Sequence, residues 1–185
     1  GQITAAKQVD VALGAFARLR AQVPQARFLI VGEQTSPEVD LGAVVETLGV
    51  ADSVHFVGFV DDLVDFTRWI AAADVVVNLR NPTVGETSAT ALRALAAGRP
   101  LIVWDHGWYA ELPDDVCLKA PPGDEEGLLA AMLVLAHDAE RRQAMGRRAA
   151  AYATREHAPA RTADAYLRAV QSVLARRGHP PSPTV

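Results

Sequence analysis

A polar turn between an apolar strand pattern and an alanine-rich helix is the part of the sequence best suited to chemistry. The strand pattern covers Asp74 to Arg80, the turn contains Gly85-Glu86-Thr87-Ser88, and the helix pattern ends at Gly98. A strand that runs directly into a helix places free backbone N–H groups and the positive end of a helix dipole at the carboxyl edge of a sheet. The pattern therefore predicts an anion site formed by Gly85, Thr87 and Ser88.

Glu86 adds a carboxylate to this turn. A helix cap explains one hydroxyl, from Thr87 or Ser88, but it does not explain an acidic side chain as well. The carboxylate oxygens could accept hydrogen bonds from sugar hydroxyls while the backbone holds a phosphate. The turn is thus typical of a site for a phosphorylated sugar or a nucleotide, and a plain helix cap is the alternative.

Two earlier stretches of the chain could complete such a site. Lys7 stands just before the first helical pattern, where its ammonium could reach a diphosphate, and the alternative is an ordinary surface lysine. Gly58-Phe59-Val60 follows a strand pattern, so that its backbone could approach a planar base beside the apolar Phe59 ring. A plain strand-to-helix turn is the alternative there. The arginines that could also neutralise phosphate charge are Arg80, Arg93 and Arg99.

Several familiar ligand motifs are missing from the sequence. It contains no phosphate loop ending in Gly-Lys-Ser/Thr, no Gly-x-Gly-x-x-Gly, no spaced His/Cys set and no Asp-x-Asp. We therefore expect neither a resident metal nor a cofactor. Neutralisation of phosphate charge falls to the basic side chains and the helix end.

Composition favours one globular domain. The chain has 185 residues, of which 50% are hydrophobic and 22% charged. Its single cysteine, Cys117, excludes an internal disulfide, and no apolar run approaches the ~20 residues that cross a bilayer. We expect a cytoplasmic protein.

The formal net charge is −4, yet the last part of the chain is basic. Most arginines after residue 138 alternate with alanines and lack interleaved aromatic residues, which is typical of solvated helix faces. We therefore expect no nucleic-acid partner.

Strand and helix patterns alternate along the chain. Strands are predicted over 26–32, 54–58, 74–80, 101–104 and 116–118, and helices over 9–19, 41–48, about 66–70, 88–97, 125–137, 139–153 and 160–176. This alternation predicts a Rossmann-like α/β fold, with a parallel sheet covered by helices on both faces and extra helices at the end. Residues 1–177 form the predicted domain, and the proline-rich residues 178–185 are expected to be disordered.

The order of these features resembles the C-terminal, donor-binding half of retaining glycosyltransferases with the GT-B fold, in the group 1 enzymes of glycosyltransferase family four. The resemblance covers nearly all of residues 1–177 and is specific in order and spacing rather than in one motif. It depends on Lys7, Gly32-Glu33, Val57-Gly58-Phe59, Ala73-Asp74-Val75-Val76-Val77, the Gly85-Glu86 turn, Ala97-Gly98-Arg99-Pro100 and Gly-Trp-Tyr-x-Glu-Leu-Pro from Gly107 to Pro113.

The resemblance implies roles for individual residues. Lys7 would bind the donor diphosphate, and Gln2 stands where the family has a partner arginine. Two family glutamates, one facing the donor sugar and one the ribose, align with Gly85 and Arg93. Glu86, one position away, is expected to take over the sugar contact, while Arg93 could meet a phosphate or the base.

The resemblance also implies an activity. Such an enzyme transfers a hexosyl unit from a nucleotide-diphosphate sugar to an acceptor with retention and without a metal, by stabilising charge on the departing diphosphate. The acceptor would lie on an N-terminal domain that this chain lacks. The fragment alone would then be inactive, and membrane contact would come only through the full-length enzyme. A non-catalytic Rossmann-like binding module and a nucleotide-sugar epimerase of the same fold remain alternatives.

Overall fold

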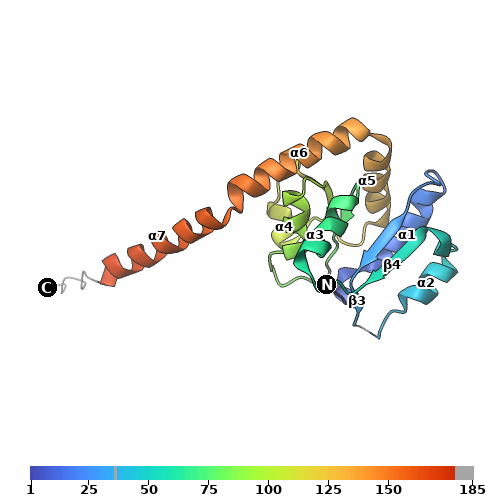
Figure 1. Cartoon of the computed structure of the whole chain (residues 1–185), viewed down its shortest axis with the longest axis horizontal. Helices are drawn as coiled ribbons and strands as arrows, with labels where there is room; N and C mark the ends of the chain where they lie inside the picture. Colours follow the sequence, from blue (N-terminus) through green and yellow to red (C-terminus); the bar gives the residue numbers. More distant parts are fainter. Residues whose placement is uncertain (36, 178–185) are drawn as a thin grey trace.

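The computed structural model describes residues 1–35 and 37–177, so the predicted disorder of residues 178–185 lies outside the described residues (Figure 1). Within these ranges every strand pairs in parallel. The strands are β1 (Gln2–Ile3), β2 (Phe28–Val31), β3 (Glu33–Gln34), β4 (Val54–Gly58), β5 (Val76–Val77), β6 (Leu101–Trp104) and β7 (Cys117–Ala120).

The pairing forms two blocks of strands. β2 pairs with β4. β3, which follows β2 after Gly32, pairs with β1. β6 lies between β5 and β7. A hydrogen bond of 2.8 Å from the Asn81 N–H to the Ala6 carbonyl links the segments that follow β5 and β1. The carboxyl ends of β1 and β5 therefore lie side by side.

Seven α-helices are described within these ranges, together with short 3-10 turns at Ala5–Lys7, Ala51–Ser53 and Gly107–Glu111. The helices are α1 (Val9–Arg20), α2 (Leu41–Thr47), α3 (Leu63–Ala72), α4 (Ala89–Ala96), α5 (Glu125–His137), α6 (Ala139–Glu156) and α7 (Pro159–Arg177).

β6 shows why helices cover both faces of the sheet. Its four residues are fully buried, and successive side chains of a strand point to opposite faces. Ile102 and Trp104 join the core under α1 and α5, whereas Leu101 and Val103 join a second core under α4 and α6. The predicted fold class is confirmed.

One predicted strand is wrong in length. The apolar run Asp74 to Arg80 predicts a full strand, but β5 contains only Val76 and Val77, followed by a further bond of 3.0 Å from the Asn78 N–H to the Ile102 carbonyl. The chain then leaves the sheet, because the Asn81 N–H bonds to the segment after β1. This departure brings Arg80 toward the segment that holds Lys7.

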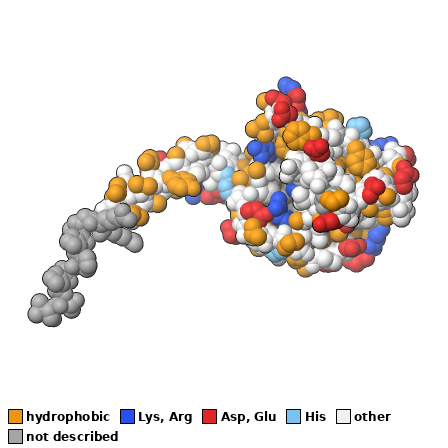
Figure 2. All heavy atoms as spheres, turned by 90° about the horizontal axis from the view of Figure 1, so that it is seen from below, with side chains coloured by type: hydrophobic (Ala, Val, Ile, Leu, Met, Phe, Trp, Pro, Cys, Tyr) orange, Lys and Arg blue, Asp and Glu red, His pale blue; other side chains and the backbone are white. Residues whose placement is uncertain are grey.

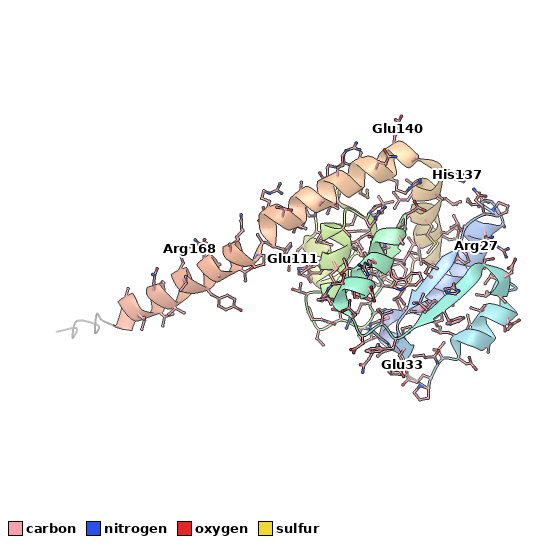
Figure 3. All side chains as sticks on the ribbon, in the orientation of Figure 1. Arg27, Glu33, Glu111, His137, Glu140 and Arg168 are labelled. Atoms are coloured by element: carbon pink, nitrogen blue, oxygen red, sulfur yellow. The ribbon has the colours of Figure 1, made fainter. Side chains whose placement is uncertain are left out.

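α7 projects away from the body and has its residues 161–175 exposed (Figures 1 and 2). Arg168 points from it into open space (Figure 3). One side of the helix carries the exposed apolar side chains Tyr166, Leu167, Val170, Val173 and Leu174. No helix in the described part of the chain is long and apolar enough to span a membrane.

Candidate functional site

The carboxyl edge of the strands holds most of the predicted site. Arg27 and Glu33 flank β2 and mark the amino and carboxyl edges of the strands in Figure 3. The 3-10 turn with Lys7 follows β1 at the carboxyl edge, and the turn from Asn81 to Ser88 follows β5 there. The Asn81–Ala6 hydrogen bond joins these two segments. The structure thus brings Lys7 close to the β5–α4 turn.

Lys7 is half-buried and donates its ammonium to the Gln2 carbonyl. Desolvation lowers the pKa of Lys7 from its ordinary value, and the nearby positive charge of Arg80 lowers it further. An anion bound beside Lys7 would relieve both effects.

Glu86 lies inside the turn and is already well hydrogen bonded. One carboxylate oxygen pairs with the Arg80 guanidinium, and the other accepts from the Thr83 hydroxyl at 2.9 Å and the Val84 N–H at 3.0 Å. Its pKa is lowered first by its own backbone N–H, then by the Thr83 and Val84 donors, with a further contribution from Arg80. Glu86 is therefore held as a carboxylate that organises the turn.

The turn exposes Gly85 and Thr87, while the Gly85 N–H donates to the Thr83 hydroxyl oxygen at 3.1 Å. Gly85 is exposed with a φ of 85°, a left-handed conformation that glycine adopts without strain. Thr87 is exposed as well. These two predicted anion ligands are accessible at the start of α4.

Ser88 is the N-cap of α4. Its hydroxyl oxygen accepts the Ala91 N–H at 3.2 Å, and its proton goes to the Asn78 side-chain oxygen at 3.0 Å. The Tyr109 hydroxyl donates to that same Asn78 oxygen at 2.5 Å. Ser88 and Tyr109 are buried, so this network fixes the start of α4 from below.

Gly58 ends β4, and Phe59 and Val60 follow it in the loop to α3. Gly58 has a φ of 81°, which lets the chain turn sharply, and the Phe59 ring is 56% exposed. Phe59 and Val60 line an open groove of about 510 Å³ with residues at the start and along one side of α3. In the described part of the chain, neither Lys7 nor Glu86 lines this groove. These residues form a region distinct from the polar turn.

Arg93 lies on α4 one turn beyond its start. Its guanidinium donates to the Ala89 carbonyl of the same helix at 3.0 Å. The structure thus places Arg93 on the helix that begins at the turn, with a contact to its own helix. Within residues 1–35 and 37–177, no group of three or more His, Cys, Asp and Glu side chains is arranged to hold a metal.

A family model described as glycosyl transferases group 1 matches residues 1–138. The chain belongs to the group 1 glycosyltransferase family. The predicted family is therefore confirmed. The match covers the 3-10 turn after β1, the β4–α3 loop, the β5–α4 turn and α4, so it includes every predicted site residue of this family member.

A curated relative in sequence is mannosylfructose-phosphate synthase of Agrobacterium fabrum. It is 34% identical over an alignment of 140 residues, and the match covers 69% of this chain and 30% of the relative. This chain of the group 1 family therefore spans less than a third of that enzyme.

Solved structures share the fold. Anabaena HepE in complex with UDP is 19% identical, and the match covers 93% of this chain and 47% of HepE with a TM-score of 0.82. The C-terminal domain of LpcC, a group 1 glycosyltransferase of Francisella tularensis, is 21% identical, with 86% and 84% of the two chains covered and a TM-score of 0.77. The group 1 chain thus has the fold of a C-terminal glycosyltransferase domain.

Sequence reasoning missed the polar network that supports this group 1 site. Asn78 is a polar residue in the middle of an apolar strand pattern, and buried polar side chains require partners. That signal could have identified Asn78, whereas nothing in the sequence indicates that Tyr109 is its partner. His106, in the loop after β6, contacts the Arg80 carbonyl through Nε2.

Proposed function

We propose that the chain is the donor-binding domain of a glycosyltransferase that transfers a hexosyl unit from a nucleotide-diphosphate sugar to an acceptor. Family membership supports glycosyl transfer. Anabaena HepE, with the same fold, has been solved in complex with UDP and with UDP-glucose. The proposal includes retention at the anomeric carbon, independence from metals and a cytoplasmic location.

The observation that carries this proposal is the Asn81–Ala6 hydrogen bond, which holds Lys7 beside the turn that starts α4. Glycosyl transfer builds negative charge on the departing diphosphate. An ammonium and a helix N-terminus aimed at one place stabilise that charge without a metal. We assign the diphosphate to Lys7, Gly85, Thr87 and the α4 amino end that Ser88 caps.

Glu86 is assigned to the donor sugar. An ionised carboxylate has about four acceptor positions, and the described contacts to Arg80, Thr83 and Val84 occupy three of them. The Glu86 backbone N–H also acts on this carboxylate, so a sugar hydroxyl next to the diphosphate would take the place of one of these donors. Replacement of Glu86 by glutamine would keep the shape of the side chain but remove its negative charge.

The nucleoside end is assigned to Gly58, Phe59 and Val60. An exposed phenylalanine ring beside an open groove gives an apolar surface on which a base can stack. Arg93, on α4, is assigned to a phosphate or a base carbonyl. Its bond to Ala89 would then be exchanged for a bond to the ligand.

A second, N-terminal domain is proposed to supply the acceptor. This chain spans 30% of the mannosylfructose-phosphate synthase and 47% of HepE. The apolar side of α7 is exposed along its length, and such a surface is typically covered by another part of a protein. The full-length enzyme would provide any contact with a membrane.

Calorimetric titration of these residues with UDP, GDP and ADP tests the proposed function. We expect one nucleoside diphosphate to bind in the micromolar to low millimolar range, and the corresponding nucleoside to bind more weakly. No binding of any of the three at millimolar concentration would contradict donor binding and would favour a non-catalytic module.

Turnover is the second readout. With a nucleotide sugar and simple sugar acceptors, the 185-residue chain should give no multiple turnover, because the acceptor site is proposed to lie elsewhere. Clear multiple turnover by this chain alone would refute the two-domain part of the proposal.

A further inference from the structure

We propose that Arg80 is a second diphosphate-binding cation beside Lys7, and that Glu86 is the positioning residue that holds its guanidinium. This inference rests on the proposed function and adds to it. Sequence alone leaves Arg80, Arg93 and Arg99 as equivalent candidates, and the structure separates them.

The backbone of Arg80 is fixed at the site from two directions. The Arg80 carbonyl accepts a hydrogen bond from His106, and because a carbonyl can only accept, His106 must carry its proton on Nε2. The next residue, Asn81, donates its N–H to the Ala6 carbonyl, one residue before Lys7. The peptide group between Arg80 and Asn81 is therefore held by His106 on one side and by the Lys7 segment on the other.

The side chain of Arg80 is held in place and keeps spare donors. Only 29% of it is exposed, and its Nη1 group forms an ion pair with Glu86. A guanidinium carries five N–H donors in a planar fork, which suits two phosphate oxygens at once. Glu86 thus fixes one arm of the fork and leaves the rest for a ligand.

The charges at the site are unbalanced without an anion. Lys7 and Arg80 each carry a positive charge, Glu86 carries one negative charge, and the α4 amino end adds partial positive charge. The lowered pKa of Lys7, caused by desolvation first and by Arg80 second, shows that the two cations act on each other. A diphosphate between them would neutralise the excess and remove their mutual repulsion.

The other two arginines are placed differently. Arg99 directly precedes β6, so it lies toward the amino edge of the sheet, opposite the turn. Arg93 donates to the carbonyl of its own helix. Arg80 is the one of the three candidates whose side chain pairs with the turn, through Glu86, and whose following residue bonds to the Lys7 segment.

The test compares the affinities of the variants for three ligands with the same base: the nucleoside diphosphate, the nucleoside monophosphate and the nucleoside. The base is the one of uracil, guanine and adenine whose diphosphate the wild type binds most tightly. Arg80→Gln should weaken diphosphate binding by roughly 10-fold to 100-fold, weaken monophosphate binding less, and leave nucleoside binding unchanged. Arg80→Lys should recover part of the loss, because it restores the charge without the fork.

Arg18→Gln is the matched control. Arg18 is also ion-paired, with Glu126 at 2.6 Å, but it lies near the carboxyl end of α1. We expect diphosphate affinity of this variant to stay within twofold of the wild type. Thermal unfolding of each variant shows that it is folded at the titration temperature.

Glu86→Gln separates the positioning of Arg80 from direct contact with the donor sugar, because a nucleoside diphosphate lacks the donor sugar. The substitution should weaken diphosphate binding in the wild-type background and have no further effect in the Arg80→Gln background. An equal loss in both backgrounds would contradict the positioning role.

The inference and the proposed function can fail separately. If wild type binds the diphosphate more tightly than the nucleoside and Arg80→Gln binds it equally well, Arg80 is not a ligand while donor binding stands. If the wild type does not distinguish diphosphate from nucleoside, the proposed function is overturned together with this inference.

Discussion

The β4–α3 loop and the β5–α4 turn each join a strand to the helix that follows it, in two consecutive strand–helix units of the chain. The two connections nevertheless differ in their residues and hydrogen bonds. In the turn, Glu86 accepts bonds from Arg80, Thr83 and Val84. Ser88 caps α4 and bonds to Asn78, which also accepts from the buried Tyr109. In the loop, Phe59 is 56% exposed beside an open groove. The turn is a set of polar groups fixed before any ligand arrives, whereas the loop offers the exposed Phe59 ring beside a groove that three aspartates and Arg68 also line.

This difference matches the two ends of a nucleotide. A diphosphate is best bound by preorganised charges and N–H groups, because these need little rearrangement when the anion arrives. A base is bound mainly by stacking and tolerates a less constrained partner. The following predictions test whether the two regions divide the ligand in this way.

The largest effect is expected for Lys7→Ala. Loss of a charge-assisted contact should weaken nucleoside diphosphate binding by roughly 10-fold to 100-fold, with nucleoside binding unchanged, as measured by calorimetry. Lys119→Ala is the control, because Lys119 is the second of the two lysines of the chain. It lies in β7, away from the turn, and pairs with Asp114 at 2.7 Å. Equal losses for the diphosphate and the nucleoside would show that Lys7 does not act on the phosphates.

Ser88→Ala should lower the free energy of unfolding by about 1–2 kcal/mol, measured by urea denaturation, because it removes the α4 cap and one partner of Asn78. Asp62→Ala, which removes the cap of α3, is the comparison in the other region. Since Asp62 is exposed and Ser88 is buried, the Ser88 substitution should be the more destabilising. The reverse order would argue against a more rigid turn.

Phe59→Ala should weaken binding of the diphosphate and of the nucleoside by the same factor, about threefold to tenfold, since it removes stacking with the base. Its stability should change little, because the ring is 56% exposed. Val170→Ala on α7 is a control for the loss of an exposed apolar side chain, with Val170 54% exposed. A loss seen with the diphosphate and absent with the nucleoside would place Phe59 at the wrong end of the ligand.

The smallest expected effect is the uptake of less than one proton for each diphosphate that binds. The pKa of Lys7 lies below its ordinary value in the free protein, and a bound diphosphate opposes both the desolvation and the repulsion from Arg80. Binding must therefore raise the pKa of Lys7, so protons are taken up at pH values between the pKa of the free protein and that of the complex, and affinity falls as the pH rises through this interval.

Calorimetry in buffers of different ionisation enthalpy measures this uptake. Lys7→Met should abolish it, and this variant retains the amino terminus and all other titrating groups. Proton uptake of equal size in Lys7→Met would assign the effect to another group.

Much of the fold follows from the sequence alone. The alternation of strand and helix patterns predicts the parallel sheet, and the buried run Leu101–Trp104 predicts β6 as its bounds stand. The strand over Asp74 to Arg80 is predicted too long, because an apolar pattern does not reveal that Asn81 bonds to Ala6 in a segment about 75 residues earlier. Such long-range bonds decide where a strand ends.

The candidate site is predictable in part for the same reason. Turn chemistry indicates an anion site at Gly85–Ser88, and the α4 cap is found there. The partners of Glu86 are less accessible to sequence reasoning, since Arg80 lies six positions before it and could point anywhere. The loop from β6 to β7 contributes His106 and Tyr109 through tertiary packing, which no local pattern encodes.

The central claim is that the turn binds phosphates and the loop binds the base, and amide chemical-shift mapping by NMR tests it most directly. Inorganic pyrophosphate should shift the amide signals of Lys7 and of residues 84–91, and leave those of residues 58–60 in place. The preferred nucleoside should shift residues 58–60 and leave the turn unchanged. Pyrophosphate shifts that avoid the turn and Lys7, or nucleoside shifts centred on the turn, would contradict the account.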